Sequence, residues 1–367
     1  MLYIHELSDW PTFAWSSESL AAPLAAVRHR QGRLIGRMEE LGFQLREEAV
    51  LRTLTTEVVK SSEIEGSHLN EQQVRSSLAR RLGLYVAGLV SADRDVEGVV
   101  EMMIDATQNF ARLLTAERLF AWHAALFPAG RSGLSKIITG AWRTENSGPM
   151  QVVSGPMGRE HVHFEAPHAS RIENEMNVFL NWFENSNLMI DPVLKAAIAH
   201  LWFVTIHPFE DGNGRIARAI AELALARSEQ TAQRFYSMSA QIRLERNAYY
   251  DMLEATQKGG LDITNWLAWF LDCLDEAFIG AETILGSVLL KARFWEAHAG
   301  GKFNDRQRAI INRLHDGFEG KLTSSKWATL AKCSQDTALR DIDDLLKRGI
   351  LAKEAAGGRS TSYSLAR

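Results

Sequence analysis

Apolar residues near the N-terminus recur at the three-, four- and seven-residue intervals of a helix face. In the first such stretch they are Leu24, Val27, Leu34, Met38 and Leu41, and Gly42 follows as a stop. A second helix is predicted from about Arg46 to Gly66, and Asn70 with Gln73 resembles a capping box that opens a third. Residues 1–90 therefore predict helices joined by short turns.

The middle of the chain, from about 92 to 285, continues as helices with one interruption. Residues 150–164 alternate and carry β-branched side chains around Gly155–Gly158, which predicts a β-hairpin. Asp191-Pro192 then supplies an N-cap and a proline at the first position of a new helix. Because this helix is apolar almost all round, we expect it to be central and buried, and it leads directly to His207.

The last part of the chain, residues 301–367, predicts helix, turn, helix and two short strands around Gly357-Gly358. That is the order of a winged helix-turn-helix. Its candidate recognition helix, Gln335–Arg348, is rich in aspartate, which is a poor match to a phosphate backbone. DNA binding stays open for this segment, beside packing or homodimerisation. The whole chain predicts a mainly α fold.

Composition narrows the class of protein. The 367 residues are 46% hydrophobic and 23% charged with a net charge of −4, which is typical of a soluble globular protein and not of a general nucleic-acid coat. No apolar run reaches the roughly 18 residues of a membrane span, and the N-terminus does not resemble a signal peptide. Cys273 and Cys333 are too few for a disulfide framework, so we expect a cytoplasmic location.

The densest chemistry lies in HPFEDGNGRIAR, residues 207–218. Gly212 and Gly214 allow successive N–H groups to turn the same way, and a helix is predicted to begin after Gly214. Such a nest on a helix N-terminus binds anions. Arg215 and Arg218 would project from the first turn of this helix, where their forked guanidinium groups suit phosphate oxygens.

Two more side chains would complete a phosphoryl- or nucleotidyl-transfer site. Asp211 is suited to hold Mg²⁺ between phosphates, and His207 to remove a proton from an incoming hydroxyl near neutral pH. A structural interpretation of the same residues is a buried histidine, a plain turn and a solvated Arg218–Glu222 pair, opposite the apolar stripe of the helix. Their joint occurrence in register favours the site.

The stretch from His207 to Arg218 resembles the signature of the Fic family, His-x-Phe-x-(Asp/Glu)-Gly-Asn-Gly-Arg-x-x-Arg, at every fixed position. Family members transfer AMP from ATP to a hydroxyl of a target protein. The resemblance implies His207 as general base, Asp211 as Mg²⁺ ligand, Gly212, Asn213 and Gly214 as anion hole, Arg215 and Arg218 as holders of the β- and γ-phosphates, and Phe209 as anchor of the loop. A phosphotransferase branch carries lysine in place of Gly214, and another member transfers phosphocholine, so the motif leaves the transferred group open.

The hairpin at 150–164 lies where the family has its flap, which docks the target protein by strand addition. By this resemblance, Val152 and Val153 would contact the nucleotide. His161 and His163 alternate within the hairpin, but with no third ligand candidate nearby we do not expect them to bind a metal.

A second segment, RNAYYDMLEATQKGG, follows the signature helix. Tyr249, Tyr250 and Gln257 match family residues that line the adenine and ribose pocket, although relatives can carry Asn in place of Gln257. The alternative for each tyrosine is a place in the helix core.

A third segment, SSEIEG at residues 61–66, places Glu65 in the last turn of a helix. A carboxylate there opposes the helix dipole at a cost of up to about 1 kcal/mol, so it would benefit from a cation on another segment. The stretch resembles the family's inhibitory motif, (Ser/Thr)-x-x-x-Glu-(Gly/Asn), through Ser61, Glu65 and Gly66. There the glutamate pairs with the second arginine of the signature, here Arg218, and keeps the γ-phosphate from seating productively.

The leading hypothesis is a self-inhibited, Mg²⁺- and ATP-dependent protein adenylyltransferase acting on Ser, Thr or Tyr hydroxyls. Its expected domains are an N-terminal region with the inhibitory helix (1–90), a Fic catalytic core (91–285) and the winged helix (301–367). One alternative is an enzyme that also removes AMP, with Glu65 positioning water. Another is a nucleotide-sensing transcription regulator, although a sensor has no need of His207 beside the nest.

Overall fold

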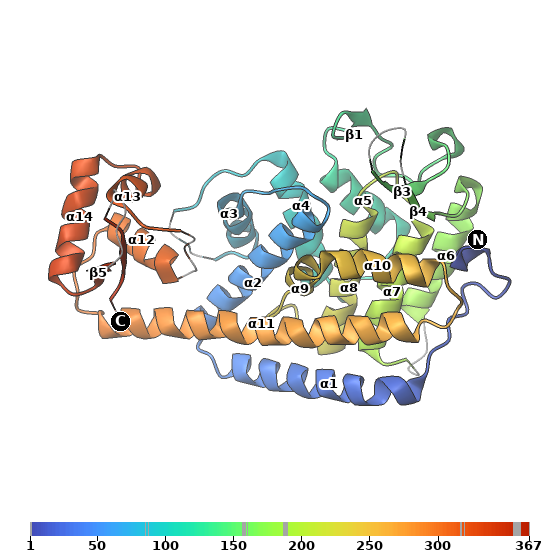
Figure 1. Ribbon diagram of the computed structural model, residues 1–367, viewed down its shortest axis with the longest axis horizontal. Coiled ribbons are helices and arrows are strands. Elements are labelled where there is room, and N and C mark those ends of the chain that lie inside the picture. The colour runs from blue at the N-terminus through green and yellow to red at the C-terminus, as the bar shows by residue number, and fades with distance from the viewer. Residues whose placement is uncertain are drawn as a thin grey trace. The chain divides into compact units, whose positions relative to one another are not determined.

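The computed structural model of the protein describes residues 2–84, 86, 88–155, 159, 161–185, 190–315, 318, 320–354 and 361–366. It is mainly α-helical, with three small two-stranded sheets among these residues, so the predicted fold class is confirmed (Figure 1). The chain divides into two compact units, Met1–Glu282 and Thr283–Arg367. No helix in the described part of the chain combines the length and the apolar content that a membrane crossing needs.

The first unit holds most of the helices. Its elements are η1 (Ile4–Glu6), α1 (Ser17–Glu39), α2 (Phe43–Ile64), α3 (Glu71–Arg81), α4 (Arg94–Gln108), α5 (Ala116–Leu126), β1 (Arg131–Ser132), β2 (Ser135–Lys136), η2 (Glu145–Ser147), β3 (Gln151–Ser154), β4 (His161–Glu165), η3 (Ala169–Arg171), α6 (Ile172–Asn185), α7 (Pro192–Ile206), α8 (Asn213–Glu229), α9 (Met238–Leu244), α10 (Arg246–Gln257) and the first part of α11 (Thr264–Ala297).

The N-terminal helices follow the predicted pattern. Helix α2 begins at Phe43, three residues before the predicted Arg46, and Gly66 ends its C-terminal turn with a φ of 80°. Asn70 caps α3 by accepting a hydrogen bond from the Gln73 backbone at 3.2 Å. The second half of the expected capping box is absent, because the Gln73 side chain accepts instead from the backbone of Asp93 at 3.1 Å.

Helix α7 is the centre of the first unit. Asp191 caps it through the Val193 backbone at 2.8 Å, and every residue from Val193 to Ile206 except Lys195 is buried. The predicted central, buried helix is therefore confirmed. Helix α8 follows it in the chain and packs against α7, α2, α4 and α5, which encloses α8 as well (Figure 1).

Strands β3 and β4 form the predicted hairpin as an antiparallel pair with a bulge between Val152 and Val153. Most of the turn expected at Gly155–Gly158 lies outside the described residues. A shorter hairpin, which the sequence pattern did not suggest, pairs β1 with β2 through Arg131–Lys136 and Ser132–Ser135.

Close packing of α4 on α5 depends on Gly98. A Cβ atom at this position would lie 1.8 Å from the backbone oxygen of Ala125, so only glycine fits. We expect Gly98→Ala to destabilise the unit by about 2 to 3 kcal/mol, the scale of overpacking against a backbone that cannot yield. Urea unfolding measures this effect.

Gly36→Ala is the matched control, because Gly36 lies in α1 with no atom within 4 Å of the added Cβ. Alanine in an exposed helix position stabilises by roughly 0.5 to 1 kcal/mol relative to glycine. Equal unfolding midpoints for Gly98→Ala and wild type would contradict the packing argument.

The second unit is built on α12 (Asp305–His315), α13 (Ser324–Leu330) and α14 (Gln335–Lys347), followed by β5 (Leu351–Lys353) and β6 (Tyr363–Leu365). Its core gathers Ile310, Ile311, Leu322, Trp327, Ala338, Ile342, Leu345, Ile350, Leu351 and Tyr363. Strands β5 and β6 pair antiparallel, and the turn predicted at Gly357-Gly358 lies outside the described residues. The order α13, turn, α14 and two strands is the one the sequence predicts, whereas α12 was not predicted. A winged helix stays the interpretation of these elements.

Candidate active site

The turn after α7 places His207 in an unusual backbone conformation. Its φ of 53° and ψ of 58° are left-handed, a conformation that few residues other than glycine adopt. Pro208 disfavours continuation of the helix at His207, which ends α7 at Ile206. The imidazole Nδ1 lies 3.1 Å from the carbonyl oxygen of Val204, which can only accept, so Nδ1 carries the proton. Nε2 is then the basic nitrogen. Burial lowers the pKa of His207, so the ring is neutral at physiological pH.

The next residues form a tight loop that ends in a helix start. Asn213 closes it by donating to the Phe209 carbonyl at 2.8 Å and accepting from the Phe209 N–H at 3.0 Å. Phe209 is fully buried and stacks on His123, with ring centroids 4.2 Å apart and planes 5° from parallel. Gly212 has a φ of 82°, and a Cβ there would lie 2.9 Å from Phe127. The loop thus needs glycine at this position for both conformation and space.

The structure corrects two expectations for α8. The helix begins at Asn213, not after Gly214, and its polar face is not solvated: Arg218 and Glu222 are each 2% exposed. The interpretation of Arg218 and Glu222 as a solvated pair is wrong, because both are buried and Glu222 pairs with Arg234 at 2.8 Å. Burial raises the pKa of Glu222 to about 8. The physical reason is that other helices enclose α8 on every side.

Arg218 lies against the end of α2. Its Nε donates to the Ser61 hydroxyl at 2.9 Å, and its Nη2 donates to the Ser61 carbonyl at 2.8 Å. The same Nη2 lies 2.8 Å from Oε1 of Glu65. Burial by itself lowers the pKa of Arg218, but the Glu65 carboxylate outweighs this effect and raises the pKa. Residues far apart in the sequence therefore form an ion pair between a buried arginine and a glutamate whose side chain is 30% exposed, as the resemblance implied for Glu65.

The Glu65 carboxylate also covers the N-terminus of α8. A Cβ at Gly214 would lie 2.2 Å from Glu65 Oε1, so the carboxylate packs directly on this backbone. A helix N-terminus favours an anion. The Tyr250 hydroxyl lies 3.4 Å from Glu65 Oε2, and Arg246 donates to the Ile64 carbonyl at 2.6 Å, so α10 holds the end of α2 in place.

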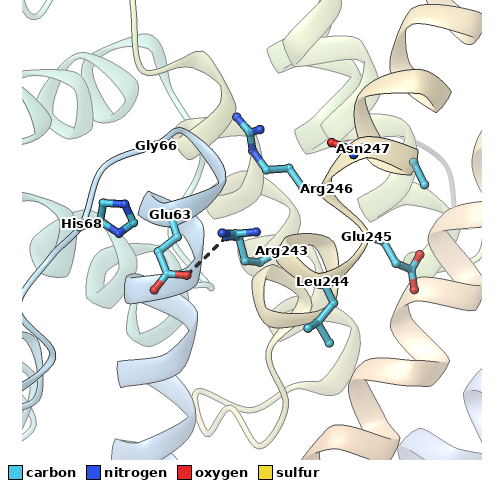
Figure 2. A pocket seen from close by; sticks show the side chains of 9 residues that line it. Glu63, Gly66, His68, Arg243, Leu244, Glu245, Arg246 and Asn247 are labelled. Atoms are coloured by element: carbon cyan, nitrogen blue, oxygen red, sulfur yellow. Dashed lines mark ion pairs between the residues drawn. The ribbon is translucent and has the colours of Figure 1, made fainter. Parts of the chain in front are cut away.

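A cavity of about 420 Å³ lies beside the same helix end (Figure 2). Glu63 and Gly66 line it from α2 and its terminating turn, and Arg243 of α9 faces Glu63 across a 3.4 Å ion pair. None of the predicted phosphate-binding residues lines this cavity. It is therefore separate from the site at the start of α8.

Asp211 is held by residues that the sequence analysis missed. Its carboxylate accepts from the Ser132 hydroxyl in the β1–β2 hairpin and from the Gly212 N–H at 2.5 Å. Its carbonyl lies 3.2 Å from Nε2 of His123, whose Nδ1 accepts from the Gly140 N–H. Burial lowers the pKa of His123 to about 4, so this ring is a neutral donor to the loop. No local pattern marks Ser132 or His123.

Arg143 is a further residue of the site that the sequence analysis did not identify. It is 3% exposed, donates from Nε to the His207 carbonyl at 2.8 Å and from Nη2 to the Pro167 carbonyl at 2.5 Å. Its own backbone N–H donates to the Pro208 carbonyl at 2.9 Å. Arg143 thus fixes the left-handed turn at His207.

Two buried guanidinium nitrogens at the site, Arg215 Nε and Arg218 Nη1, have no hydrogen-bond partner among the described residues. Buried N–H groups of this kind are normally paired, so both fit an anionic ligand. Arg215 also stacks its guanidinium over Phe127 at 5.0 Å. With an aspartate oxygen at Asp211 and cationic groups on the first turn of α8, the residues present fit Mg²⁺ and phosphates.

A protein-family model described as the Fic/DOC family matches residues 113–225, which include the loop and most of α8. Residues 113–225 form a Fic/DOC domain. A second model, described as a domain of unknown function (DUF4172), matches residues 3–84.

Curated relatives match the chain over short stretches. Protein adenylyltransferase Fic of Aedes aegypti is 34% identical over 101 residues, which are 27% of this chain and 19% of that protein. Protein adenylyltransferase fic-1 of Caenorhabditis elegans is 43% identical over 58 residues, 16% of this chain and 11% of that protein. The chain thus spans a fifth or less of the length of these two relatives.

Solved structures share the fold. A Fic family protein from Desulfovibrio desulfuricans G20 superimposes with a TM-score of 0.53 at 23% identity, over 97% of this chain and 98% of that one. A Fic domain containing signaling protein from Bacteroides thetaiotaomicron gives a TM-score of 0.52 at 18% identity, over 71% of this chain and 98% of that one.

The three residues predicted to line an adenine pocket take different places around the Fic domain. Tyr249 and Gln257 are buried, with the Tyr249 hydroxyl 2.9 Å from His200 and the Gln257 amide 3.3 Å from Thr205. Tyr250 lies next to Glu65, and Tyr249 interacts with Arg218 of α8. Contact with a nucleotide stays a prediction for all three.

The flap residues lie on β3 and β4. Val153 is 47% exposed, whereas Val152 is partly buried opposite Phe164. The reason given against a metal at His161 and His163 is wrong, because the fold brings Glu254 of α10 to them. This third side chain was not predictable from its distance along the chain.

Proposed function

We propose that the chain is a Mg²⁺-dependent protein adenylyltransferase that transfers AMP from ATP to Ser, Thr or Tyr hydroxyls of target proteins. We further propose that Glu65 holds it in a self-inhibited state. The Fic/DOC domain and the names of the curated relatives support a transfer of this class. The observation that carries the proposal is the set of groups at the N-terminus of α8. A basic imidazole and a carboxylate lie beside two arginines, and each arginine has a buried nitrogen without a hydrogen-bond partner among the described residues.

Each residue has a distinct task in this reaction. The target hydroxyl attacks the α-phosphorus of ATP, the bond from that phosphorus to the bridging oxygen breaks, and pyrophosphate leaves. Nε2 of His207 takes the hydroxyl proton. The N–H groups of Gly212, Asn213 and Gly214 with Arg215 and Arg218 bind the phosphate oxygens. Asp211 would hold Mg²⁺, which neutralises charge on the leaving phosphates when bound.

Self-inhibition follows from competition for one anion position. Glu65 pairs with Arg218 and packs on Gly214, so its carboxylate sits on the donors that the outer phosphates of ATP need. Two anions repel each other in a partly buried site more strongly than in water. ATP then binds with its phosphates displaced from the line of attack.

Labelled ATP tests the transfer. The full chain is incubated with Mg²⁺ and ATP labelled on the α-phosphate or on the γ-phosphate, with and without cell extract, in the Glu65→Gly background. We expect protein-bound label from the α-phosphate alone, and none with Asp211→Asn. Label from the γ-phosphate would make the chain a phosphotransferase, and no label from either position would overturn the proposal.

A further inference from the structure

A cluster of three metal-type ligands lies outside the proposed transfer site. His161 and His163 alternate on β4, and Glu254 reaches them from α10, with one ligand atom of each within 4.8 Å of the others. The two imidazole rings lie edge to face with centroids 4.6 Å apart. His161 is exposed and the other two are partly buried, so the cluster is open to ions from solvent.

We propose that His161, His163 and Glu254 bind a transition-metal ion of the Zn²⁺ class. Two imidazoles and one carboxylate are a ligand set that suits Zn²⁺ and leaves the fourth tetrahedral position open. With metal–ligand bonds of about 2.0 to 2.1 Å, tetrahedral ligand atoms lie roughly 3.4 Å apart. To reach that spacing, His163 Nδ1 and Glu254 Oε2, now 2.5 Å apart, would move about 0.9 Å apart to admit the ion. The exposed His161 ring would turn to place its ligand atom at the same distance from both.

The hydrogen bonds around His163 fit a metal ligand. Its Nδ1 lies 2.5 Å from Oε2 of Glu254, and its Nε2 lies 2.6 Å from the hydroxyl of Ser154. An ion that replaces the proton between Nδ1 and Glu254 leaves the Nε2–H to donate to Ser154. Ligating histidines generally donate their second N–H in this way, which fixes the tautomer and the ring orientation.

The Glu254 carboxylate also accepts a hydrogen bond from a residue outside the cluster. Lys258 donates to its other carboxylate oxygen, Oε1, at 2.5 Å. Glu254 Oε2 faces His163, so the two carboxylate oxygens have separate partners and the ligand atom is held toward the imidazole. The lysine opposes the ion electrostatically, but a hydrogen-bonded ligating carboxylate is the usual arrangement in metal sites.

A bound ion would tie two elements that are otherwise joined by the His163–Glu254 contact. One is the β3–β4 hairpin, and the other is α10, whose Tyr250 contacts Glu65. The site itself does not depend on the proposed transferase activity. If that activity holds, occupancy would stiffen the hairpin at which a target is expected to dock.

Cobalt binding tests the site directly. The full chain is freed of metal with a chelator and titrated with Co²⁺ in excess Mg²⁺, which occupies oxygen sites such as Asp211 and does not compete for imidazole. We expect saturable visible absorption typical of low-coordinate Co²⁺ at one ion per chain, displaced by Zn²⁺. The affinity should fall on the order of 100-fold or more in His161→Ala and Glu254→Gln, and about 10- to 100-fold in Ser154→Ala, which removes only the supporting hydrogen bond.

His168→Ala is the matched control, because His168 is an exposed histidine close in sequence to β4 and outside the cluster. It should bind Co²⁺ as wild type does. Absence of saturable binding in wild type, or equal affinity in wild type and His161→Ala, overturns the proposal. His161 is exposed on a hairpin, so its replacement leaves the fold intact, and unchanged circular dichroism and thermal unfolding verify this for each variant.

Discussion

Glu65→Gly is expected to raise transfer of label from ATP to protein by about 30- to 1,000-fold. Glu65 binds Arg218 at 2.8 Å and packs on Gly214, so its carboxylate competes with the outer phosphates of ATP. If the pair biases the site by roughly 2 to 4 kcal/mol, its removal increases the competent fraction by that factor. Glycine leaves Arg218 without its carboxylate partner, and ATP then supplies a better one. Initial rates at saturating Mg²⁺-ATP measure the change.

Glu63→Gly is the control for this variant. Glu63 lies two residues earlier in α2 and pairs with Lys60 at 2.9 Å and Arg243 at 3.4 Å, so its loss weakens the same helix end and leaves Glu65 intact. We expect little activation from it. Equal labelling by wild type and Glu65→Gly would eliminate the inhibitory role of Glu65, and equal activation by both glycine variants would assign the effect to loosening of α2.

His207→Ala is expected to lose transfer by roughly 10² or more, the typical scale for a general base. The loss should persist in the Glu65→Gly background, since release of inhibition does not replace a proton acceptor. Binding of ATP should stay close to wild type, because the phosphate donors belong to α8 and to the loop that Asn213 closes. Labelling and calorimetric ATP binding, measured on the same variant, separate the two effects. Labelling at the Glu65→Gly rate would remove the base assignment.

The pKa of His207 also predicts in which pH range the rate of transfer should fall. A general base acts in its neutral form, and burial holds the pKa of His207 below the ordinary imidazole value of 6.5. Transfer by Glu65→Gly should therefore persist as the pH falls through 6.5, and decline only below it. A rate that is already half lost above pH 6.5 would contradict this pKa shift.

Interactions between residues close in the chain were sufficient to predict much of the fold, the loop at His207 and the arginine positions at the start of α8. The Asp191 cap, the buried α7 and the β3–β4 hairpin follow from residues within a few positions of one another. The loop at 207–214 is local as well, because its glycines, its proline and the Asn213–Phe209 hydrogen bonds lie within one short segment. Helical spacing then sets the positions of Arg215 and Arg218 on α8.

The sequence analysis was wrong about which faces of a helix are buried by neighbouring helices. The apolar stripe of α8 predicted one buried face, but Arg218 and Glu222 on the other face are buried too. Periodicity reports where apolar residues are needed, and it does not report a buried arginine whose partner comes from another helix. Arg234 is that partner for Glu222.

By itself the sequence determined the helical class, the loop at His207 and the residue types at the start of α8. Only the tertiary structure decided which distant side chains meet: Ser132 with Asp211, and Glu254 with His161 and His163. The Glu65–Arg218 pair was implied by the family resemblance alone, and the fold brings its two residues together. The physical reason is the separation of the interacting residues along the chain. Helix caps and turns are formed by neighbours in the chain, whereas these contacts join segments that approach one another only when the packed core has fixed the positions of α2, α8 and α10.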